Sequence, residues 1–394
     1  MKILFVSAVL PYPLHSGGQI RIYNLLKRLS RRHSITLLSF IRSEEERAYV
    51  KELGFCASVH MVMRGRAWQP KYYIGAIFSS YPFLLCTYDN RRMRETLDGL
   101  MAKETYDVVH LEPFYVMPSV PKAARPLVIS EHNVEYEVYD SYVKRFPVPF
   151  MRPMLSWDVG KLRNWERIAW KRANALTAVS AYDASVMEAY RSRHVHVVSN
   201  GVDLDAFPYH APVKRKNPTV VFVGNFRWYP NLDAANELLE RIWPGIQKRI
   251  PNARLSIVGR DMPKDLKQRV VHAGGDALDS VENISEVYRN ADILVAPHAI
   301  AGGTKFKMLE AMASGLPVVT SKEGMFGLTA VPDTHYFPAQ TPKEYVDQVY
   351  HIWENSASTR VVAARARTLV EAEYSWEHIA DTLETVWKHT YERP

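Results

Sequence analysis

Two patterns of apolar residues alternate along the chain. Continuous apolar runs of about four to eight residues are typical of strands buried on both faces, and apolar residues at every third or fourth position predict amphipathic helices. The helical pattern is seen in IRIYNLLKRLSRR (20–32) and VGKLRNWERIAWKRA (159–173). The strand pattern occurs in the first half at residues 2–9, 34–40, 107–111, 126–130, 175–180 and 196–200. This alternation predicts a parallel sheet covered by helices.

The same alternation restarts after a polar stretch. Residues 203–218 contain three prolines and a basic cluster, and we interpret them as a linker. Further strands are expected at 219–226, 254–261, 291–298 and 316–321. The predicted fold is therefore α/β, with two doubly wound Rossmann-like domains, residues 1–202 and 219–373, that face each other across a cleft. Residues 374–394 predict a terminal helix that packs back towards the first domain.

The charge of the chain is uneven. Its 394 residues carry a net charge of +8, but residues 1–200 carry +10 and the remainder carries −2. A basic first half indicates an anionic partner. Because no zinc spacing, helix-turn-helix pattern or RNA-stacking motif occurs, an acidic membrane surface or a phosphorylated substrate is favoured over nucleic acid. Residues 64–94 have basic ends and an aromatic middle, which predicts an interfacial membrane element or, alternatively, a helix and loop packed in the core.

The N-terminus and the cysteines bear on the compartment. The first apolar run meets Pro11 and Pro13 and has no cleavage site after it, so a buried strand is favoured over a signal peptide. No apolar window has the length of a membrane span. Cys56 and Cys86 lack metal-type spacing and fit a reducing compartment. We expect a cytoplasmic protein, with peripheral attachment to the inner face of the membrane.

Three candidate residues or motifs follow predicted strands, where ligands of this architecture bind. Gly17 and Gly18 precede a helix, whose N–H groups can face an anion, although a plain turn would also explain them. His132 follows a strand and can donate to a sugar hydroxyl or relay a proton, unless it is structural. Arg227 can bind a diphosphate with two parallel hydrogen bonds, unless it is only solvated.

The stretch AGGTKFKMLEAMASGLPVV (301–319) contains the largest group of candidates. Its helix begins with Gly302, Gly303 and Thr304, which present backbone N–H groups to an anion. Lys305 in the first turn opposes the helix dipole unless an anion binds nearby. Glu310 lies in an apolar helix and needs a hydrogen-bonding partner. A ribose diol can donate two hydrogen bonds to this carboxylate, and an internal ion pair with arginine is the alternative.

With these residues the chain resembles the glycosyltransferases of family 4, the retaining, group 1 enzymes with the GT-B fold. The resemblance covers nearly the whole chain. It rests on the Gly17-Gly18 loop, AVS (178–180), VSNGVD (198–203), VGNF (223–226) and, above all, ADILVAPH with GGTKFKMLEAMASGLPVVTS. It implies a nucleotide-diphosphate sugar donor, such as a UDP- or GDP-sugar, a glycan or lipid-linked acceptor, and no divalent metal.

The resemblance also implies roles for single residues. Glu310 matches the glutamate that holds the ribose, Lys305 the basic residue near the diphosphate, and Gly18 the glycine loop at the phosphates. His132 matches the histidine that contacts the donor sugar. We expect Arg227 and Lys305 to stabilise the leaving diphosphate.

The chain departs from the family pattern at two places. The family motif has two glutamates eight positions apart, and Gly302 stands in the place of the first, as in a branch with GGTK. In the loop after Gly224, Asn225 and Pro230-Asn231 stand where many members have arginine and lysine-glycine. Two alternatives to a retaining transferase in cell-surface glycan synthesis remain. One is a GT-B epimerase or inverting transferase, and the other is a non-catalytic protein that binds nucleotide sugars.

Overall fold

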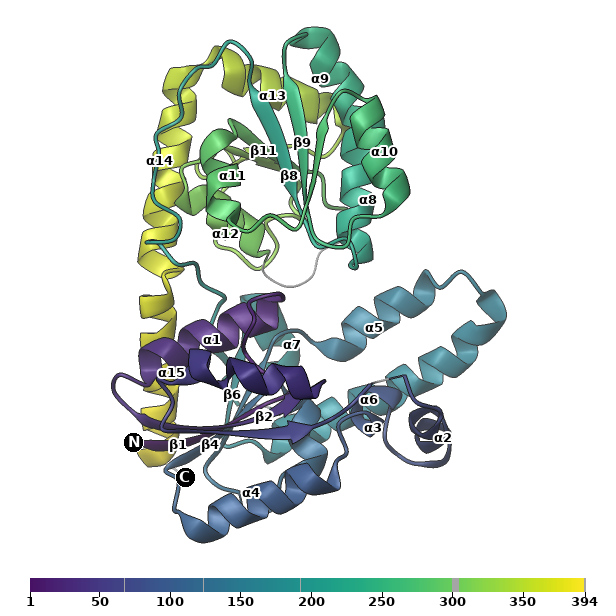
Figure 1. Ribbon diagram of the computed structural model, residues 1–394, viewed down its shortest axis with the longest axis vertical. Coiled ribbons are helices and arrows are strands. Elements are labelled where there is room, and N and C mark those ends of the chain that lie inside the picture. Colours follow the sequence, from purple (N-terminus) through teal and green to yellow (C-terminus); the bar gives the residue numbers. More distant parts are fainter. Residues whose placement is uncertain (67, 123, 192, 300–304, 393–394) are drawn as a thin grey trace. The chain divides into compact units, whose positions relative to one another are not determined.

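The structure is a computed structural model, which describes residues 1–66, 68–122, 124–191, 193–299 and 305–392. It divides into two compact units (Figure 1). The first unit consists of residues 1–199 and 379–394, and the second of residues 200–378. The helix α15 (Trp376–Glu392) therefore begins in the second unit and contributes its remaining residues to the first.

The first unit is built on a parallel sheet of seven strands in the order β3-β2-β1-β4-β5-β6-β7. In register, Lys2 lies beside Ser34 on one neighbouring strand, and Ile3 lies beside Val108 on the other. The strands are β1 (Lys2–Ser7), β2 (Ser34–Ile41), β3 (Ser58–Met63), β4 (Val108–Glu112), β5 (Leu127–Glu131), β6 (Ala175–Ala178) and β7 (His196–Val197). The order changes direction at β1 and β4, and Glu112 lies at the carboxyl end of β4.

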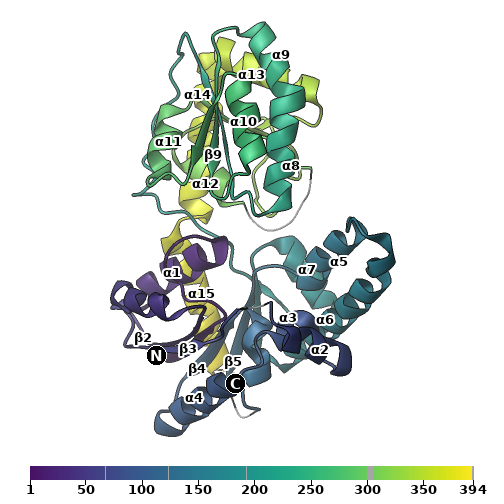
Figure 2. The same cartoon turned by 45° about the vertical axis from the view of Figure 1, so that its right-hand side comes forward.

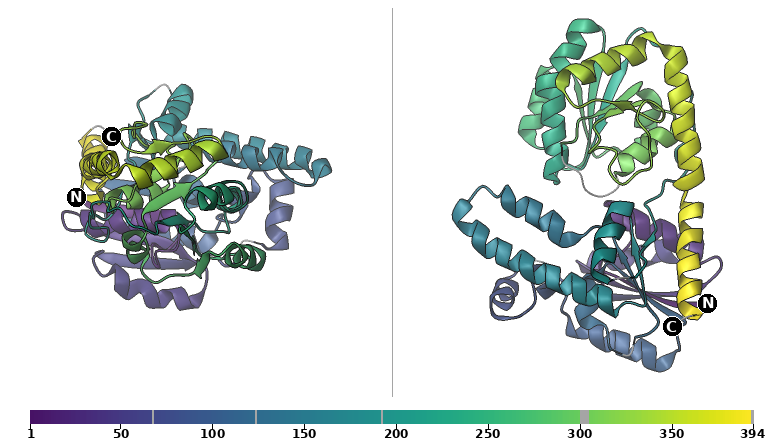
Figure 3. Two further views of the ribbon diagram at one scale, coloured as in Figure 1. Left: turned by 90° about the horizontal axis from the view of Figure 1, so that it is seen from above. Right: turned by 180° about the vertical axis from the view of Figure 1, so that it is seen from behind.

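Helices cover both faces of this sheet. Figures 1 and 2 show α1 on one side of the sheet and α4 on the other. The helices of the unit are α1 (Gly17–Leu29), α2 (Pro70–Phe78), α3 (Phe83–Cys86), α4 (Arg91–Lys103), α5 (Glu135–Lys144), α6 (Arg152–Arg172) and α7 (Ala181–Arg191), with short 3-10 helices at Glu44–Leu53, Phe114–Ser119 and Pro149–Met151. The helices α5 and α6 form an antiparallel hairpin, which is seen from behind in Figure 3.

The second unit has a six-stranded parallel sheet in the order β10-β9-β8-β11-β12-β13. Its strands are β8 (Thr219–Val223), β9 (Arg254–Gly259), β10 (Asp276–Asp279), β11 (Ile293–Ala296), β12 (Val318–Thr320) and β13 (Phe337–Pro338). Its helices are α8 (Tyr229–Glu237), α9 (Trp243–Arg249), α10 (Lys264–His272), α11 (Ile284–Asn290), α12 (Phe306–Ala313), α13 (Pro342–Glu354) and α14 (Ser356–Glu373), with a π turn at Leu238–Ile242. The helices α8 and α10 lie on one face, and α11 and α12 on the other (Figure 1).

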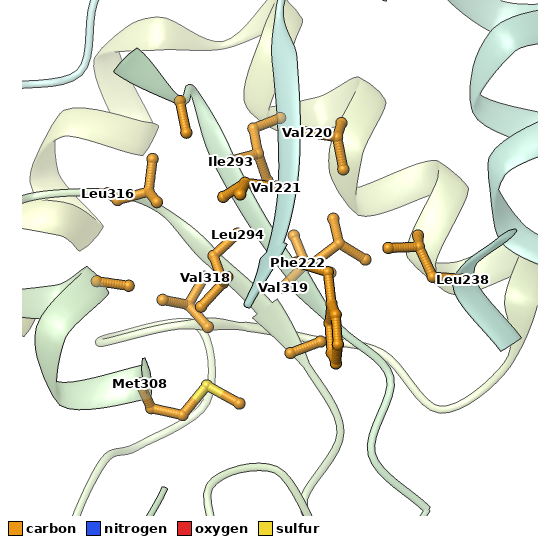
Figure 4. Packing of buried hydrophobic residues seen from close by; sticks show 14 of the residues in the cluster. Val220, Val221, Phe222, Leu238, Ile293, Leu294, Met308, Leu316, Val318 and Val319 are labelled. Carbon is orange, nitrogen blue, oxygen red and sulfur yellow. The ribbon is translucent and has the colours of Figure 1, made fainter. Parts of the chain in front are cut away.

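Apolar side chains from the central strands form the core of the second unit. Figure 4 shows Val220, Val221 and Phe222 of β8 packed with residues of β11 and β12. Met308 of α12 joins this cluster and is completely buried. Since this helix packs its apolar side chains against the sheet, the position of its polar residues is set by the core.

The predicted parallel α/β architecture is confirmed, and so are the ten strands expected from apolar runs; most are shorter than their runs, whereas β2 is one residue longer and β4 and β5 are shifted by one residue. Three observed strands were not expected: β3, β10 and β13. All three lie at sheet edges, and most of the side chains of β3 and β10 are partly or fully exposed. Edge strands lose the continuous apolar run because one side of each faces solvent.

The end of α12 follows the expected chemistry. Gly315 has a φ of 78°, and a Cβ at this position would lie 2.4 Å from the carbonyl oxygen of His210. Only glycine fits this left-handed position without strain. The helix therefore ends where the glycine and the following Pro317 predict.

No helix among the described residues combines the length and the apolar character needed to cross a bilayer. Cys56 and Cys86 are buried free thiols in the first unit. Burial raises the pKa of Cys56 to about 12, so this thiol stays protonated at neutral pH.

Candidate functional site

His132 lies directly after β5 in the first unit, at the carboxyl edge of the sheet. Its Nε2 atom is 2.8 Å from Oε1 of Glu112, which ends the neighbouring strand β4. The His132 side chain is 20% exposed, whereas the Glu112 side chain is completely buried. A buried carboxylate therefore orients an imidazole that remains accessible from outside.

Glu112 is held by two further polar groups. Arg21 of α1 donates from Nε to its Oε1 at 2.6 Å, and His110 Nε2 contacts its Oε2 at 3.1 Å. Trp387 donates its indole N–H to His110 Nδ1 at 3.0 Å. Because an indole can only donate, His110 carries its proton on Nε2 and donates it to Glu112. The tautomer of His110 is thus set by a residue of α15.

The protonation of this cluster follows from its contacts. Burial on its own would raise the pKa of Glu112, but Arg21 and the two imidazoles hold the pKa well below its usual value. Burial also lowers the pKa of His110, so this ring is neutral. The ionised Glu112 then accepts a hydrogen bond from the Nε2–H of His132, which leaves Nδ1 of His132 for a ligand.

Gly18 lies against the same imidazole. A Cβ added at Gly18 would be 3.3 Å from Cε1 and 3.4 Å from Nδ1 of His132. Gly17 begins α1, and the preceding Ser16 caps this helix by accepting a hydrogen bond from the backbone of Gln19. The structure therefore brings the glycine loop and His132 together, and a larger side chain at position 18 would crowd the ring.

In the second unit, Arg227 follows β8 and pairs with Asp261, which follows β9. Its Nε is 3.0 Å from Asp261 Oδ2, and its side chain is 75% exposed. The two loops are tightly apposed, because a Cβ at Gly259 would lie 1.6 Å from the carbonyl oxygen of Gly224. Arg227 is thus at the carboxyl edge of the sheet, as expected, but its guanidinium has a carboxylate partner.

Lys305 and Lys307 lie at the start of α12. Lys305 donates to the carbonyl oxygen of Glu323 at 2.8 Å, and Lys307 donates to Asn231 Oδ1 at 2.8 Å. Lys307 also lies 3.3 Å from His298 Nε2 and over the ring of Phe222. Neither lysine forms an ion pair with a residue that the structure describes. Two ammonium groups with only neutral hydrogen-bond acceptors are a candidate site for an anion.

The environment of these lysines weakens their charge. Burial lowers the pKa of Lys305 to about 8. Burial, and the repulsion from Lys305, lower the pKa of Lys307 to about 7. A bound anion would offset both effects and restore the full charge of each ammonium group.

Glu310 lies further along α12 and is half-buried. Its Oε2 accepts a hydrogen bond from the hydroxyl of Tyr288 on α11 at 2.9 Å. Burial raises the pKa of Glu310 to about 7, despite this hydrogen bond and the attraction of Lys307. No arginine forms an ion pair with Glu310 within the described part of the chain. The partner is a neutral phenol, which leaves the carboxylate short of hydrogen-bond donors.

Three candidates from the same motif, Gly302, Gly303 and Thr304, lie outside the described residues. Glu112, Lys307 and Tyr288 were not among the site residues predicted from the sequence, and Asn231 was identified only as part of a departure from the family pattern. A polar residue directly after a buried strand is the signal that would have indicated Glu112. The spacing of Lys307, three residues before Glu310, would have placed both on one helix face.

Metal ligands were also sought in the structure. No group of three or more His, Cys, Asp or Glu side chains that could hold a metal ion occurs among the described residues.

Two family models match this chain. The model for glycosyltransferase family 4 matches residues 15–206, and the model for glycosyl transferases of group 1 matches residues 217–355. The fold is that of GT-B glycosyltransferases, with one Rossmann-like unit under each model. The chain belongs to glycosyltransferase family 4 of the group 1 enzymes, and it is a glycosyltransferase.

Three known proteins are similar to this chain. A 44.6 kDa protein of the cps region of Klebsiella pneumoniae is 21% identical over 97% of this chain and 98% of its own length. The phosphatidyl-myo-inositol mannosyltransferase of Mycobacterium leprae is 29% identical over 72% of this chain and 73% of its own. The structure of Anabaena HepE in complex with UDP and glucose has a TM-score of 0.68 at 14% identity, and the match covers 99% of this chain and 100% of that one.

Proposed function

We propose that this protein transfers a sugar from a nucleotide-diphosphate sugar to a glycan or a lipid-linked acceptor, with retention of the anomeric configuration and without a metal ion. The observation that carries the proposal is the charge pattern of α12, where Lys305 and Lys307 precede Glu310 on one helix. A nucleotide-diphosphate sugar has the complementary pattern, an anionic diphosphate followed by a ribose diol.

The lysines account for the diphosphate. Each has a neutral oxygen as its partner and a pKa lowered by burial. When the sugar leaves, negative charge develops on the diphosphate, and fixed cations in a partly dry site stabilise it without reorganisation. In other transferases, a divalent cation stabilises this developing charge. Arg227 can join this site if its pairing with Asp261 opens.

Glu310 accounts for the ribose. Its carboxylate has one described donor, the Tyr288 hydroxyl, and retains acceptor positions for both hydroxyls of a diol. Tyr288 is almost completely buried, so its hydrogen bond fixes the carboxylate in one orientation. Binding two donors would favour the ionised form and return the pKa of Glu310 towards its usual value.

His132 is proposed to contact the donor sugar. Its Nε2 is engaged with Glu112, so Nδ1 beside Gly18 is the nitrogen available to a sugar hydroxyl. In the transfer, the acceptor oxygen bonds to the anomeric carbon on the face from which the diphosphate departs, while the bond from that carbon to the phosphate oxygen breaks. The acceptor proton passes to the departing phosphate oxygen, so charge is balanced.

The acceptor is proposed from the relatives. One mannosylates phosphatidyl-myo-inositol according to its name, and another is a protein of a cps region. A role in cell-surface polysaccharide or glycolipid synthesis follows, and with it peripheral attachment to the inner face of the membrane. The basic first half of the chain, at +10, fits an anionic surface of this kind.

A thermal-shift screen with nucleoside diphosphates and their sugars tests donor binding. A preferred donor should raise the melting temperature, because it binds the folded state. The product made from that donor is then examined by NMR. An anomeric proton with the same orientation, axial or equatorial, as in the donor confirms retention. An inverted product, or an epimerised free sugar, would contradict the proposal.

The change His132→Ala tests the sugar contact. We expect turnover to fall about 100-fold with little change in the affinity for the free nucleoside diphosphate, since general acid–base and orienting groups contribute on this scale. The control is His194→Ala, an exposed histidine of the same unit. Equal losses of nucleotide affinity and turnover would assign His132 to nucleotide binding instead.

A further inference from the structure

The helix α2 carries its apolar residues on the side that faces solvent. Ile74, Ile77 and Phe78 have the i, i+3, i+4 spacing of one helix face and are 58%, 52% and 84% exposed. The opposite face, with Tyr72 and Ala76, packs against a small buried cluster. Soluble surface helices have the reverse arrangement, with apolar residues towards the core. This outward face is therefore unexplained by folding alone.

A second group of exposed apolar side chains lies at the turn of the α5–α6 hairpin. Phe150 is 84% exposed, and Met154 and Trp157 on the first turns of α6 are each 52% exposed. Phe78 and Phe150 are the two most exposed large apolar side chains among the described residues. Exposing a phenylalanine side chain to water in the folded protein costs free energy. Two phenylalanines as exposed as these indicate an interaction surface.

Direct contacts join the two groups into one surface. The ammonium of Lys161 on α6 lies 3.6 Å from the ring centre of Trp157 and donates to the carbonyl oxygen of Ser79, at the end of α2, at 2.7 Å. Trp165 donates to the carbonyl oxygen of Ser80 at 2.9 Å. Figures 1 and 2 show α2 and the hairpin projecting from the same side of the first unit. We call the six side chains Ile74, Ile77, Phe78, Phe150, Met154 and Trp157 the apolar face.

Most of the charged residues around the apolar face are basic; the acidic ones at its border are Asp140, which pairs with Lys144, and Asp158, which accepts a hydrogen bond from the backbone N–H of Phe83. Residues 54–88 contain Arg64, Arg66 and Lys71 but no acidic residue, and residues 141–157 contain three further basic residues and again no acidic one. Arg66, Lys71 and Arg145 are exposed. Apolar side chains within a ring of basic residues match an anionic bilayer, in which acyl chains lie below negative head groups.

The charge also argues against a second copy of the chain as the occupant. Two copies that joined through this surface would bring like charges together, and Arg66, Lys71 and Arg145, which form no ion pair with a described residue, would gain no counter-charge. A bilayer with anionic lipids supplies both the apolar layer and the negative charge. Trp157 has the aromatic character that is enriched at the boundary between head groups and acyl chains.

We propose that the apolar face, together with Arg66, Lys71 and Arg145, is the surface by which this protein binds an anionic lipid bilayer. The helix α2 lies in the plane of the interface, and Phe78 and Phe150 enter the boundary between head groups and acyl chains. This inference rests on the peripheral attachment in the proposed function and assigns it to particular residues, but it needs no donor or acceptor.

Flotation with vesicles tests the apolar part of the proposal. The purified full chain is mixed with two kinds of phosphatidylcholine vesicle. One contains no phosphatidylglycerol, and the other contains about 30%, which makes its surface anionic like that of a cytoplasmic leaflet. The variant Phe78→Ser/Phe150→Ser should lose at least about tenfold in partition, because each phenylalanine contributes on the order of 2 kcal/mol when buried. The matched control Val271→Ser/Val361→Ser removes two exposed apolar side chains of the second unit and should change partition less than twofold.

A charge variant tests the basic ring. Arg66→Gln/Lys71→Gln/Arg145→Gln should lose the preference for anionic vesicles, and raising salt to 1 M should reduce wild-type binding in the same way, because the Debye length falls to about 3 Å. The control Lys51→Gln/Arg92→Gln/Lys103→Gln removes three exposed charges of the same unit. Circular dichroism spectra like that of the wild type show that each variant is folded.

Several results would overturn the inference. Absence of wild-type binding to anionic vesicles would do so, as would equal losses in the control variants. Dimers that form without lipid and that disappear in Phe78→Ser/Phe150→Ser would assign the surface to self-association. Vesicle binding is measured without donor or acceptor. Its result therefore does not depend on whether the proposed transferase activity is found.

Discussion

The two units each contain a polar cluster at the carboxyl edge of a parallel sheet, but the clusters differ in how their charges are satisfied. In the first unit, Glu112 receives hydrogen bonds from Arg21, His110 and His132, and its pKa is held low. In the second unit, Lys307 and Glu310 have only neutral partners, and the pKa of each is shifted to about 7.

The difference indicates two kinds of task. A buried charge with a full set of partners is rigid, and it can orient a side chain such as His132 before any ligand arrives. Half-buried charges without counter-charges cost folding free energy, and a ligand that supplies the missing charge or donors recovers it. We therefore assign positioning to the cluster around Glu112 and ligand binding to the cluster on α12.

The largest expected effect comes from breaking the satisfied cluster. The change Glu112→Gln removes the buried carboxylate that pairs with the guanidinium of Arg21, which is 1% exposed. We expect the free energy of unfolding to fall by about 3–5 kcal/mol, measured by urea denaturation at pH 7. The control Glu95→Gln removes the partner of the exposed Arg91 and should cost less than about 0.5 kcal/mol. A similar small cost for both variants would show that Arg21 is not dependent on Glu112.

Changing Glu310, the carboxylate of α12, should weaken donor binding without lowering stability, which is the opposite of the effect expected at Glu112. We expect Glu310→Gln to weaken donor binding about 10- to 100-fold, because each hydrogen bond to a charged acceptor contributes about 1.5–3 kcal/mol. Its melting temperature without ligand should be unchanged or higher, since the fold disfavours the ionised form of Glu310. Isothermal titration calorimetry measures the affinity.

The exposed Glu286 on α11 offers the matched control for this experiment. The variant Glu286→Gln should bind the donor as the wild type does. Unchanged affinity in Glu310→Gln would defeat the ribose role of this carboxylate.

Proton exchange on binding sharpens the comparison further. At pH 8 in the free protein, Lys307 is mostly neutral and Lys305 is about half-charged, because their pKa values are about 7 and 8. A diphosphate raises both values, so binding should take up on the order of one proton. At pH 6, the lysines are already charged and Glu310, with a pKa of about 7, is mostly protonated. Binding a diol to its carboxylate should then release a proton.

Calorimetry in buffers of different ionisation enthalpy measures this exchange. The result that supports the assignment is a change of sign between pH 6 and pH 8. No net proton exchange at either pH would contradict the assignment of both charges to the ligand site.

The smallest expected effect is a gain in stability. Lys307 has a pKa that folding lowers from its usual value, so the folded state binds fewer protons between about pH 7 and 10.5 and becomes more stable as the pH rises through that window. The variant Lys307→Met should therefore raise the melting temperature by about 2 °C at pH 6 and by less at pH 9, while weakening donor binding about tenfold. Differential scanning calorimetry at the two pH values measures the shifts.

Lys322 is exposed in the same unit and serves as the control. The variant Lys322→Met should change neither the melting temperature nor the affinity. A loss of stability in Lys307→Met would mean that its contacts with Asn231 and Phe222 outweigh the cost of burying its charge.

The sequence predicted the central strands because their both-sided burial leaves an uninterrupted apolar run, as in β1 and β11. It did not predict β3 or β10, whose edge positions admit polar residues. At the site, the sequence singled out Glu310 because the residues beside it are apolar. It could not identify Tyr288, 22 positions earlier, because nothing local in the sequence of α11 distinguishes the one side chain that meets this carboxylate.

The sequence by itself determined the α/β architecture, because this depends on local periodicity, and it marked His132, Lys305 and Glu310 as candidate site residues by residue type and local position. Only the tertiary structure decided which of them has a complete set of partners. Arg21 reaches Glu112 across 91 positions, and Trp387 reaches His110 across 277. Such long-range pairs arise from the order of strands in the sheet and from the course of α15, and neither is written in any short stretch of residues.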